Sequence, residues 1–445
     1  NMLSDVDVNN ELRLSSGIID VADNTLGING TITGVSATDK INVSNLSSLN
    51  FGGSGAYSIP NDLFVSNPNI DNLTIDRSGG VSVGNQDFTI NGNLDLVDGN
   101  LVVGSSTLGI NGTTSGTSQI ELSNSSSLSF GGIDQFVIPA GYFAGTTEIS
   151  NLTINRTNGV VLGNQTFTIN GVLDLERGEL SAEGKTINIV GNITGNDGTI
   201  GTNSTSILNF TESLETDLAI FLPSSMFSNN TLGTLLVNRT NGFNLSNQDI
   251  IIDNELILEK GIIQGNDNLI IFNDGASFST SSSESLPADA NRFINGCVRK
   301  IGNTAFTFPI GKESIFAPIS ISAADGGGSN EEYFTACYYS YNPGLDLYFA
   351  NITDSELDHA SYSEFWILDR VEGGENNVAV TLSWDERSGP VTNLESLRVV
   401  RWDGEKWTNQ GNVSTYTNPV EDLSNGTITS GIVTSFSPFT LGSTD

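Results

Sequence analysis

Residues 76–80 (DRSGG), 155–159 (NRTNG) and 238–242 (NRTNG) are three copies of one short motif, and their spacing decides the fold. The copies begin 79 and then 83 residues apart. Other residues recur at the same spacing, among them an Asn-Gln pair after each arginine, at 85–86, 164–165 and 247–248. A fixed period of this length is typical of stacked repeat proteins, so we expect an elongated architecture.

The residues between these recurring positions alternate between apolar and polar side chains. Residues 167–175 (FTINGVLDL) and 186–190 (TINIV) show the two-residue period of half-buried strands. Asn-Gly and Asp-Gly pairs, as at 170–171 and 197–198, separate the strands, and these residue types tolerate the positive φ of tight corners. Because residues 1–280 show no sustained apolar period of a helix, the sequence predicts an all-β protein.

Two all-β architectures fit the pattern: a parallel β-helix with turns of ~20 residues, and a string of small β-sandwiches, one per copy. Each copy has few large apolar residues, which favours a thin core shared between neighbouring turns. We therefore predict a right-handed parallel β-helix, or solenoid, over residues 1–285. Its predicted repeats cover about residues 5–75, 76–154, 155–237 and 238–285.

The composition changes after the polar stretch 281–287 (SSSESLP), which is typical of a junction. The repeat stops there. Tryptophan then appears, at Trp366, Trp384, Trp402 and Trp407, within alternating segments such as 378–384 (VAVTLSW). We predict that residues 286–445 form an antiparallel β-sandwich that caps the open end of the solenoid.

The chain is strongly acidic, with a formal net charge of −34. Nucleic-acid binding needs clustered Lys and Arg, so the charge argues against it, and it also argues against anionic membranes. No segment approaches the ~20 apolar residues of a membrane span, so we expect no membrane insertion. The chain starts within a pattern and without a signal peptide, as expected for a piece of a longer protein.

Calcium is a possible ligand, because the charge eases divalent-cation binding and some runs are rich in oxygen ligands. Asp5, Asp7 and Asn9 alternate at the front, and residues 265–268 read GNDN. Neither run matches a complete calcium-loop pattern. The alternative is that these side chains form turns, which is the usual role of Asx residues in corners.

Catalytic signals are weak. His359 is the single histidine, which argues against histidine-based triads and zinc sites, and we interpret it as a surface or packing residue. Cys297 and Cys337 either form a disulfide or remain two buried thiols. Carboxylate pairs for glycoside hydrolysis cannot be recognised from sequence spacing. We expect a protein without enzymatic activity and without an organic cofactor.

A family resemblance lies in the second half of the chain. Residues 294–300 (INGCVRK), 306–311 (FTFPIG), 364–370 (EFWILDR) and 435–441 (SFSPFTL) resemble segments of large secreted surface proteins of Bacteroidetes. These adhesin-like proteins are associated with type IX secretion. The resemblance is specific over residues 294–441 and architectural over 1–280. It implies an extracellular or cell-surface location and a β-solenoid stalk, and it transfers no catalytic residue.

Three functions fit these observations. The first is a non-catalytic structural or adhesive module whose polar lateral surface contacts glycans or proteins by many weak interactions. The second is a subunit of an extracellular filament, assembled from copies of the chain head-to-tail or by strand addition. The third is a polysaccharide-binding or polysaccharide-degrading β-helix protein. The candidate assembly strand for the filament comprises Leu3, Val6, Val8, Leu12 and Leu14.

Overall fold

The computed structural model confirms the predicted fold class, with a parallel β-solenoid over roughly the first 280 residues, antiparallel sheets after it, and about 2% helix. Two compact units are present. Unit 1 comprises Asn1–Thr216 and Ser225–Asn229, and unit 2 comprises Asp217–Ser224 and Asn230–Asp445. The structure describes residues 1–212, 220–280, 289–325, 331–417, 423–436 and 438–445.

One turn of the solenoid in unit 1 contributes three strands to three different sheets. β10 (Asn72–Arg77), β11 (Val81–Ser82) and β12 (Phe88–Ile90) form one turn. The next three strands, β13 (Asn93–Asp98), β14 (Leu101–Val102) and β15 (Thr107–Ile110), pair with them in the same order, and every pairing is parallel.

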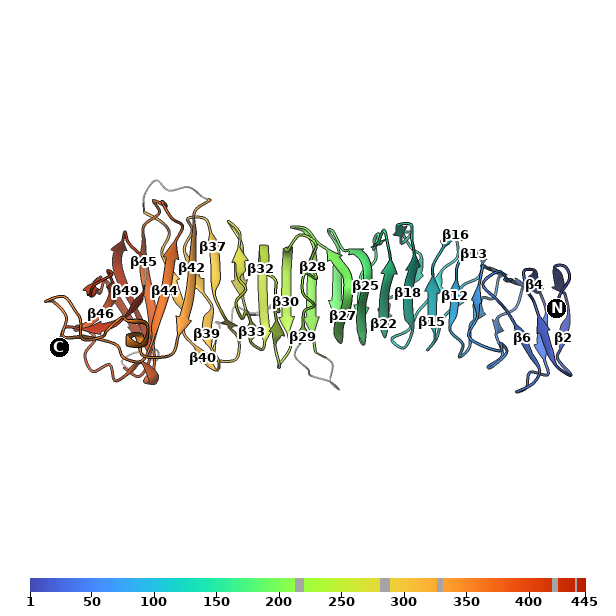
Figure 1. The fold of residues 1–445 in the computed structure, drawn as a ribbon, viewed down its shortest axis with the longest axis horizontal. Helices are drawn as coiled ribbons and strands as arrows, with labels where there is room; N and C mark the ends of the chain where they lie inside the picture. Colours follow the sequence, from blue (N-terminus) through green and yellow to red (C-terminus); the bar gives the residue numbers. More distant parts are fainter. Residues whose placement is uncertain (213–219, 281–288, 326–330, 418–422, 437) are drawn as a thin grey trace. The chain divides into compact units, whose positions relative to one another are not determined.

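Parallel pairing between neighbouring turns continues through unit 1, where the longer β25 pairs with both β22 and β23, and Figure 1 shows β12, β15, β18, β22 and β25 following one another in chain order. The strands of unit 1 not yet given are β1 (Val6–Val8), β2 (Glu11–Arg13), β3 (Ile18–Asp20), β4 (Thr25–Ile28), β5 (Thr31–Thr33), β6 (Lys40–Asn42), β7 (Ser48–Gly53), β8 (Tyr57–Ser58), β9 (Asn69–Ile70), β16 (Thr113–Gly116), β17 (Ile120–Glu121), β18 (Ser127–Gly132), β19 (Phe136–Val137), β20 (Phe143–Ala144), β21 (Thr147–Ile149), β22 (Asn151–Arg156), β23 (Val160–Val161), β24 (Phe167–Ile169), β25 (Val172–Ser181), β26 (Thr186–Ile189), β27 (Asn192–Gly201) and β28 (Ile207–Thr211).

The core of unit 1 consists of columns of inward-facing side chains, one from each turn. Leu26, Leu49, Leu73 and Leu94 stand in direct register, and each is at most 2% exposed. Burying a leucine side chain stabilises a fold by roughly 1.5–3 kcal/mol. Each member of a column is covered by the turns on both sides of it. The shared core therefore explains how a chain with few large apolar residues per repeat still buries them.

The sequence repeat does not correspond to a whole number of turns. β7 and β18 are equivalent strands of two copies (SLNFGG and SLSFGG). β7 lies between β4 and β10, whereas β18 lies in a different sheet, between β15 and β22. Leu49 and Leu73 are in register and 24 positions apart, and Leu73 and Leu94 are in register and 21 positions apart. These separations give the length of one turn, and a 79-residue repeat does not contain a whole number of such turns. Equivalent residues of successive copies therefore face different directions.

Unit 2 begins with the same parallel pattern and ends with antiparallel sheets. Its elements are β29 (Ile220–Phe221), β30 (Thr231–Asn238), β31 (Phe243–Asn244), β32 (Ile250–Lys260), β33 (Ile263–Gln264), β34 (Ile270–Phe272), β35 (Ser277–Ser279), β36 (Ile294–Asn295), β37 (Val298–Ile301), β38 (Phe306–Phe308), β39 (Ile310–Lys312), β40 (Ile315–Phe316), β41 (Ile319–Ile321), β42 (Tyr333–Tyr339), the 3-10 helix η1 (Pro343–Asp346), β43 (His359–Ala360), β44 (Phe365–Arg370), β45 (Val378–Trp384), the 3-10 helix η2 (Glu386–Ser388), β46 (Leu397–Trp402), β47 (Trp407–Asn409), β48 (Ser414–Thr417), β49 (Gly426–Val433) and β50 (Phe439–Ser443).

β37 is the strand at which the pairing changes within unit 2. It pairs parallel with β34 on one side and antiparallel with β42 on the other. The backbone edge of the parallel sheet is therefore continued by a strand of the following region, which removes an exposed edge. The predicted boundary at 285/286 lies outside the described residues. Parallel pairing continues on its C-terminal side as far as β39, which pairs with β36.

Two antiparallel sheets complete unit 2. One is the antiparallel end of the sheet that contains β37, with β42, β44, β50, β46 and β47, and the other contains β38, β41, β45, β49 and β48. Tryptophans fill the core, because Trp366 and Trp407 are 0% exposed and Trp384 is 3% exposed. The indole Nε1 of Trp366 donates a hydrogen bond to the carbonyl oxygen of Ala317 at 2.9 Å, beside β41. A strand of the first sheet is thus fixed against the start of a strand of the second.

Candidate functional site

The outward-facing side chains of the unit 1 solenoid form hydrogen-bonded ladders from turn to turn. Ser115 Oγ donates to Asp95 Oδ1 at 2.6 Å, and Asn93 Nδ2 donates to Ser115 Oγ at 2.7 Å. On another sheet, Thr194 Oγ1 donates to Asp174 Oδ1 at 2.8 Å. Each bond ties one turn to its neighbour, so these polar side chains are held in place at the surface.

Asparagine columns at the corners serve the same purpose. Asn111 Nδ2 donates to Asn91 Oδ1 at 2.8 Å, and Asn29 Nδ2 donates to Asn9 Oδ1 at 2.7 Å. The next turn places Gly131 over Asn111, where a Cβ atom would lie 2.2 Å from the Asn111 Oδ1. A side chain at that step would have to displace the Asn111 amide, so glycine at this place in the SLSFGG segment leaves room for the column.

The repeated arginines are buried at corners, and the first two bind main-chain carbonyls. Arg156 is 3% exposed and donates to the carbonyl oxygens of Asn111 at 2.9 Å and Gly112 at 3.1 Å, and also to those of Gly131 and Asp134. Burial lowers the pKa of Arg156, and the negative charge of Asp134 raises it by a smaller amount.

Arg77 occupies the equivalent corner one repeat earlier. It donates to the carbonyl oxygens of Gly52 and Gly55, and its guanidinium lies 4.9 Å from the ring centre of Tyr57. Arg239, in the third copy, is 1% exposed. The hydrogen bonds of Arg77 and Arg156 therefore stabilise the turns.

Cys297 and Cys337 form a disulfide in the structure, with a Cα–Cα distance of 4.4 Å. Cys297 directly precedes β37, and Cys337 lies opposite it in β42. The bond therefore joins the last strand of the parallel sheet to the first strand of the antiparallel sheet.

The five residues of the candidate assembly strand have different environments. Val6 and Val8 lie in β1, in register with the buried Leu26 and Ile28, and Leu12 lies in β2. Leu3 is 96% exposed, whereas Leu14 is only 5% exposed. Leu14 thus belongs to the core, and the accessible apolar side chains at this place are Leu3 and Val6.

The oxygen-rich runs considered for calcium take part in internal hydrogen bonds. Asp5 Oδ1 accepts a hydrogen bond from the Thr25 N–H at 2.7 Å, and Asn266 Nδ2 donates to Asn244 Oδ1 at 2.9 Å. Within the described residues, no three or more His, Cys, Asp and Glu side chains are placed to hold a metal ion. In the same part of the chain, no helix is both long and apolar enough to cross a membrane.

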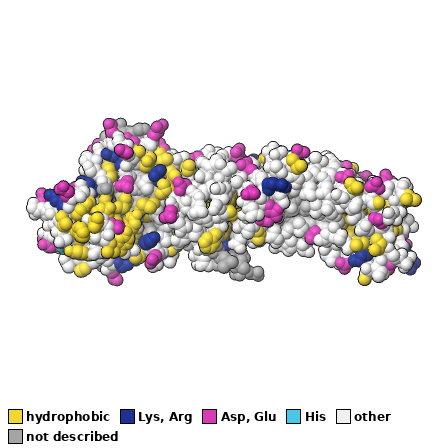
Figure 2. Space-filling model, in the orientation of Figure 1, with side chains coloured by type: hydrophobic (Ala, Val, Ile, Leu, Met, Phe, Trp, Pro, Cys, Tyr) yellow, Lys and Arg dark blue, Asp and Glu magenta, His cyan; other side chains and the backbone are white. Residues whose placement is uncertain are grey.

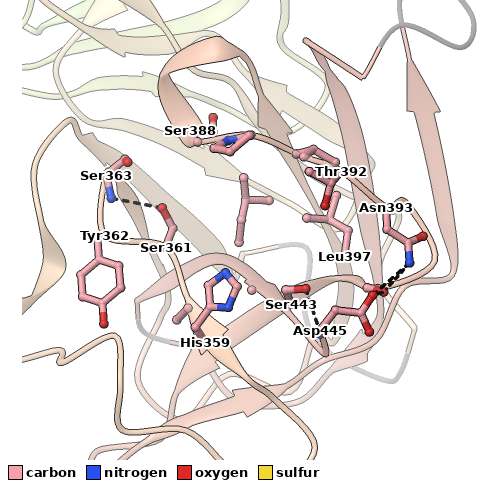
Figure 3. A pocket seen from close by; sticks show the side chains of 17 residues that line it. His359, Ser361, Tyr362, Ser363, Ser388, Thr392, Asn393, Leu397, Ser443 and Asp445 are labelled. Atoms are coloured by element: carbon pink, nitrogen blue, oxygen red, sulfur yellow. Dashed lines mark hydrogen bonds between the residues drawn. The ribbon is translucent and has the colours of Figure 1, made fainter.

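A pocket of about 440 Å³ lies in unit 2 beside the single histidine (Figure 3). Three segments that are distant in sequence form it: 359–363, 388–397 and 441–445. They meet because β50 pairs with both β43 and β46. Sequence spacing gave no signal for this pocket, since the pairing of β50 with two separate strands creates it.

The floor of the pocket is apolar and its rim is polar. Ala360, Leu397 and Leu441 are 0%, 7% and 4% exposed and form the floor. The rim carries hydroxyl, amide, imidazole and carboxylate groups. Its polar side chains include His359, Ser361, Thr392, Asn393, Ser443 and Asp445.

Internal hydrogen bonds hold several rim groups in place. Asp445 accepts hydrogen bonds from Ser396 Oγ and, at 3.0 Å, from Asn393 Nδ2, and these two bonds lower the pKa of the Asp445 carboxyl. His359 Nδ1 lies 3.0 Å from Asp358 Oδ2. In Figure 3 the imidazole lies between Tyr362 on one side and Ser443 on the other. The pocket residues among those described include no Lys or Arg.

A buried carboxyl group lies next to the pocket lining in sequence. Glu364 follows Ser363 of the pocket and is 5% exposed. Its Oε2 accepts a hydrogen bond from the Tyr338 hydroxyl at 2.7 Å. Burial raises the pKa of Glu364, whereas the hydroxyls of Ser388 and Tyr338 act in the opposite direction. Since Ser388 also lines the pocket, Glu364 lies beside one wall of it.

Hydrophobic side chains gather on the surface over the antiparallel part of unit 2 (Figure 2). The segment after β42 has two strongly exposed apolar side chains, Leu345 and Leu347, which are 75% and 69% exposed. Leu347 ends η1 with a φ of 69°, in the left-handed region that residues other than Gly, Asn and Asp rarely adopt.

No family model, no curated protein and no solved structure matches this chain. The geometry of the ladders and of the pocket is therefore the basis for inferring a function.

Proposed function

We propose that this chain is a non-catalytic structural and adhesive module that acts outside the cell. The solenoid is a rigid stalk, and its polar lateral surface contacts glycans or proteins. The observation that carries the proposal is the set of outward ladders, such as Ser115–Asp95 and Thr194–Asp174, in which donors and acceptors repeat from turn to turn.

Such a surface binds by repetition. Ladder groups that are already ordered lose little conformational entropy when a partner binds, and many weak contacts along one partner add up through avidity. The net charge of −34 favours neutral or cationic partners over anionic ones. The Cys297–Cys337 disulfide fits an oxidising compartment, which supports the extracellular location.

A bead-adhesion assay tests this function. Beads coated with the full chain are applied to surfaces that carry neutral polysaccharides. Bulky substitutions on two outer ladders, Ser115→Trp and Thr194→Trp, should weaken adhesion at least about tenfold, because each loss is multiplied along a multivalent contact. Val137→Trp is a matched control, because this side chain is also exposed (54%) but belongs to neither ladder. Equal adhesion of wild type and both ladder variants, or no adhesion to any polysaccharide, would contradict the proposal.

A second candidate function, the subunit of an extracellular filament, is favoured by the first strands. Within the described residues, β1, β2 and β3 each pair with a single strand. Leu3, Val6 and Ile18 beside their free edges are 96%, 43% and 58% exposed. Electron microscopy over a concentration series, with calcium and with chelator, should then show fibres that Val6→Lys abolishes. Discrete particles at every concentration would exclude this function.

A further inference from the structure

We propose that the pocket beside His359 binds a neutral pyranose unit of a glycan. The inference deepens the proposed adhesive function by naming a ligand class. It uses residues of unit 2 that have no part in the outer ladders of unit 1, so the two proposals can fail separately.

The distribution of apolar and polar groups in the pocket fits a sugar ring. A pyranose has C–H bonds on its faces and hydroxyl groups around its edge. The pocket has the complementary arrangement, with Ala360, Leu397 and Leu441 at the floor and hydrogen-bonding side chains at the rim. Its volume of about 440 Å³ lies within the range of small-molecule sites, ~300–1,000 Å³.

The rim offers hydrogen-bonding groups that are already oriented. Asn393 Nδ2 and Ser396 Oγ fix one oxygen of the Asp445 carboxylate, Oδ2. An ionised carboxylate has about four acceptor positions, so the remaining positions can accept hydrogen bonds from ligand hydroxyls. Such charge-assisted bonds are stronger than neutral ones. The hydroxyls of Thr392 and Ser443 add groups that both donate and accept, which suits the mixed donors and acceptors of a sugar edge.

The charges at the pocket select against anionic ligands. Asp445 lies in the lining, and Asp358 lies 3.0 Å from the imidazole of His359. The described lining contains no Lys or Arg, and the nearby Arg398 acts on Asp445 less strongly than the hydrogen bonds from Ser396 and Asn393 do. A phosphate, a sulfate or the carboxylate of a uronic acid would be desolvated beside like charge, which is unfavourable. The ligand is therefore a neutral sugar.

Saturation-transfer NMR with the full chain tests the site directly. The probes are the methyl pyranosides of glucose, galactose and mannose, with glucuronic acid as the anionic comparison. We expect saturation transfer to at least one neutral glycoside and none to glucuronic acid. Saturation transfer to glucuronic acid as strong as that to the neutral probes, or none to any neutral probe, would overturn the proposal.

Two variants assign binding to the pocket. Thr392→Trp places a large ring in the exposed lining and should abolish the signal, and Asn393→Ala, a milder change, should weaken affinity about three- to tenfold. Val413→Trp adds the same bulk at a 72% exposed position outside the lining and should bind like wild type. If Thr392→Trp binds as well as Val413→Trp, the site is elsewhere and the inference is wrong.

The outcomes also separate this inference from the adhesive function. Glycoside binding that Thr392→Trp removes, together with bead adhesion that Ser115→Trp leaves intact, would support the pocket and contradict the role of the ladders. Glycoside binding that Thr392→Trp leaves intact, together with bead adhesion that Ser115→Trp weakens, would contradict the pocket alone.

Discussion

The solenoid of unit 1 and the antiparallel part of unit 2 solve the problem of burying apolar surface in different ways. Unit 1 uses columns of similar aliphatic residues, such as Leu49 over Leu73, and each turn needs its neighbours to bury them. The antiparallel part of unit 2 uses a few large side chains, such as Trp366 and Trp407, and a disulfide. Stability in the first is therefore a sum of similar interfaces, whereas in the second it depends on particular contacts.

The same difference separates the two candidate binding surfaces. Regular stacking repeats one set of outward groups, which suits long and repetitive partners. The irregular segments of unit 2 converge from three places in the sequence and enclose a pocket with an apolar floor and a polar rim. A repeating surface gains strength from avidity, whereas a pocket must gain it from the fit to a single unit of the ligand.

The largest expected effect on stability comes from a corner arginine of unit 1. Arg156→Met removes the donors for several buried carbonyl groups, among them those of Asn111 and Gly112. We expect the free energy of unfolding to fall by roughly 3–5 kcal/mol, because buried acceptors are left without partners. Arg177→Met, at an exposed position of the same unit, is the control. Chemical denaturation followed by circular dichroism measures both, and equal stability of the two variants would show that the corner carbonyls do not depend on Arg156.

The disulfide should matter for unit 2 and leave unit 1 unchanged. Cys297 and Cys337 close a loop with a sequence separation of 40, and a loop of that size stabilises a fold by roughly 3–4 kcal/mol. The double variant Cys297→Ser/Cys337→Ser should therefore unfold at lower denaturant concentration. Tryptophan fluorescence reports this region selectively, because all four tryptophans lie in residues 366–407. An unchanged fluorescence transition would mean that strand pairing alone fixes β37 to β42.

The pH dependence of unit 2 should carry a contribution from Glu364. Its folded pKa is raised above the ordinary value of 4.5, so the folded protein binds this proton more tightly than the unfolded chain does. The contribution of Glu364 to the free energy of unfolding therefore falls as the pH rises from the ordinary pKa of this group to its raised pKa. Above the raised pKa the contribution stays constant. Asp403 and Asp445 have lowered pKa values and act in the opposite direction, so wild type alone does not isolate the effect.

The comparison with Glu364→Gln isolates it, because glutamine can still accept the Tyr338 hydrogen bond and does not ionise. The melting temperature of Glu364→Gln relative to wild type should rise as pH increases from the ordinary pKa of 4.5 through the raised one. A difference that is constant over this range would show that Glu364 has the same pKa in the folded and unfolded protein.

The smallest effect is expected at the exposed end of η1. Leu347 has a φ of 69°, which costs an L-residue roughly 1–2 kcal/mol, and glycine adopts it freely. Glycine also gives the unfolded chain more conformational entropy, which offsets part of this gain. Leu347→Gly should therefore raise the free energy of unfolding by about 0.5–1 kcal/mol. Leu345→Gly removes a similarly exposed side chain within η1, outside the left-handed region, and should not stabilise. Identical stability of the two variants would contradict the argument.

Several features of the fold were predictable because they depend on local patterns that recur. The alternation in segments such as 167–175 and the spacing of the arginine motifs predicted stacked parallel strands, and the structure has them. The relation between the sequence repeat and the solenoid turn did not follow, because β7 and β18 differ by one residue in sequence and yet pair in different sheets.

The candidate site was much less predictable. His359 was visible as a single histidine, and nothing in its neighbourhood pointed to residues 388–397 or 441–445. Long-range antiparallel pairing of β50 with β43 and β46 brings these segments together, and such pairing has no short-range signature. The same holds for Glu364, whose burial depends on side chains from several strands.

The sequence by itself determined that this protein is built from β-strands, that its first part repeats, and that its surface is acidic, since these properties are sums over local residue choices. The tertiary structure alone decided which strands share a sheet, where the parallel pairing gives way to the antiparallel pairing at β37, and which polar groups surround a common pocket. The physical reason is that register and pairing are fixed by contacts between residues far apart in the chain.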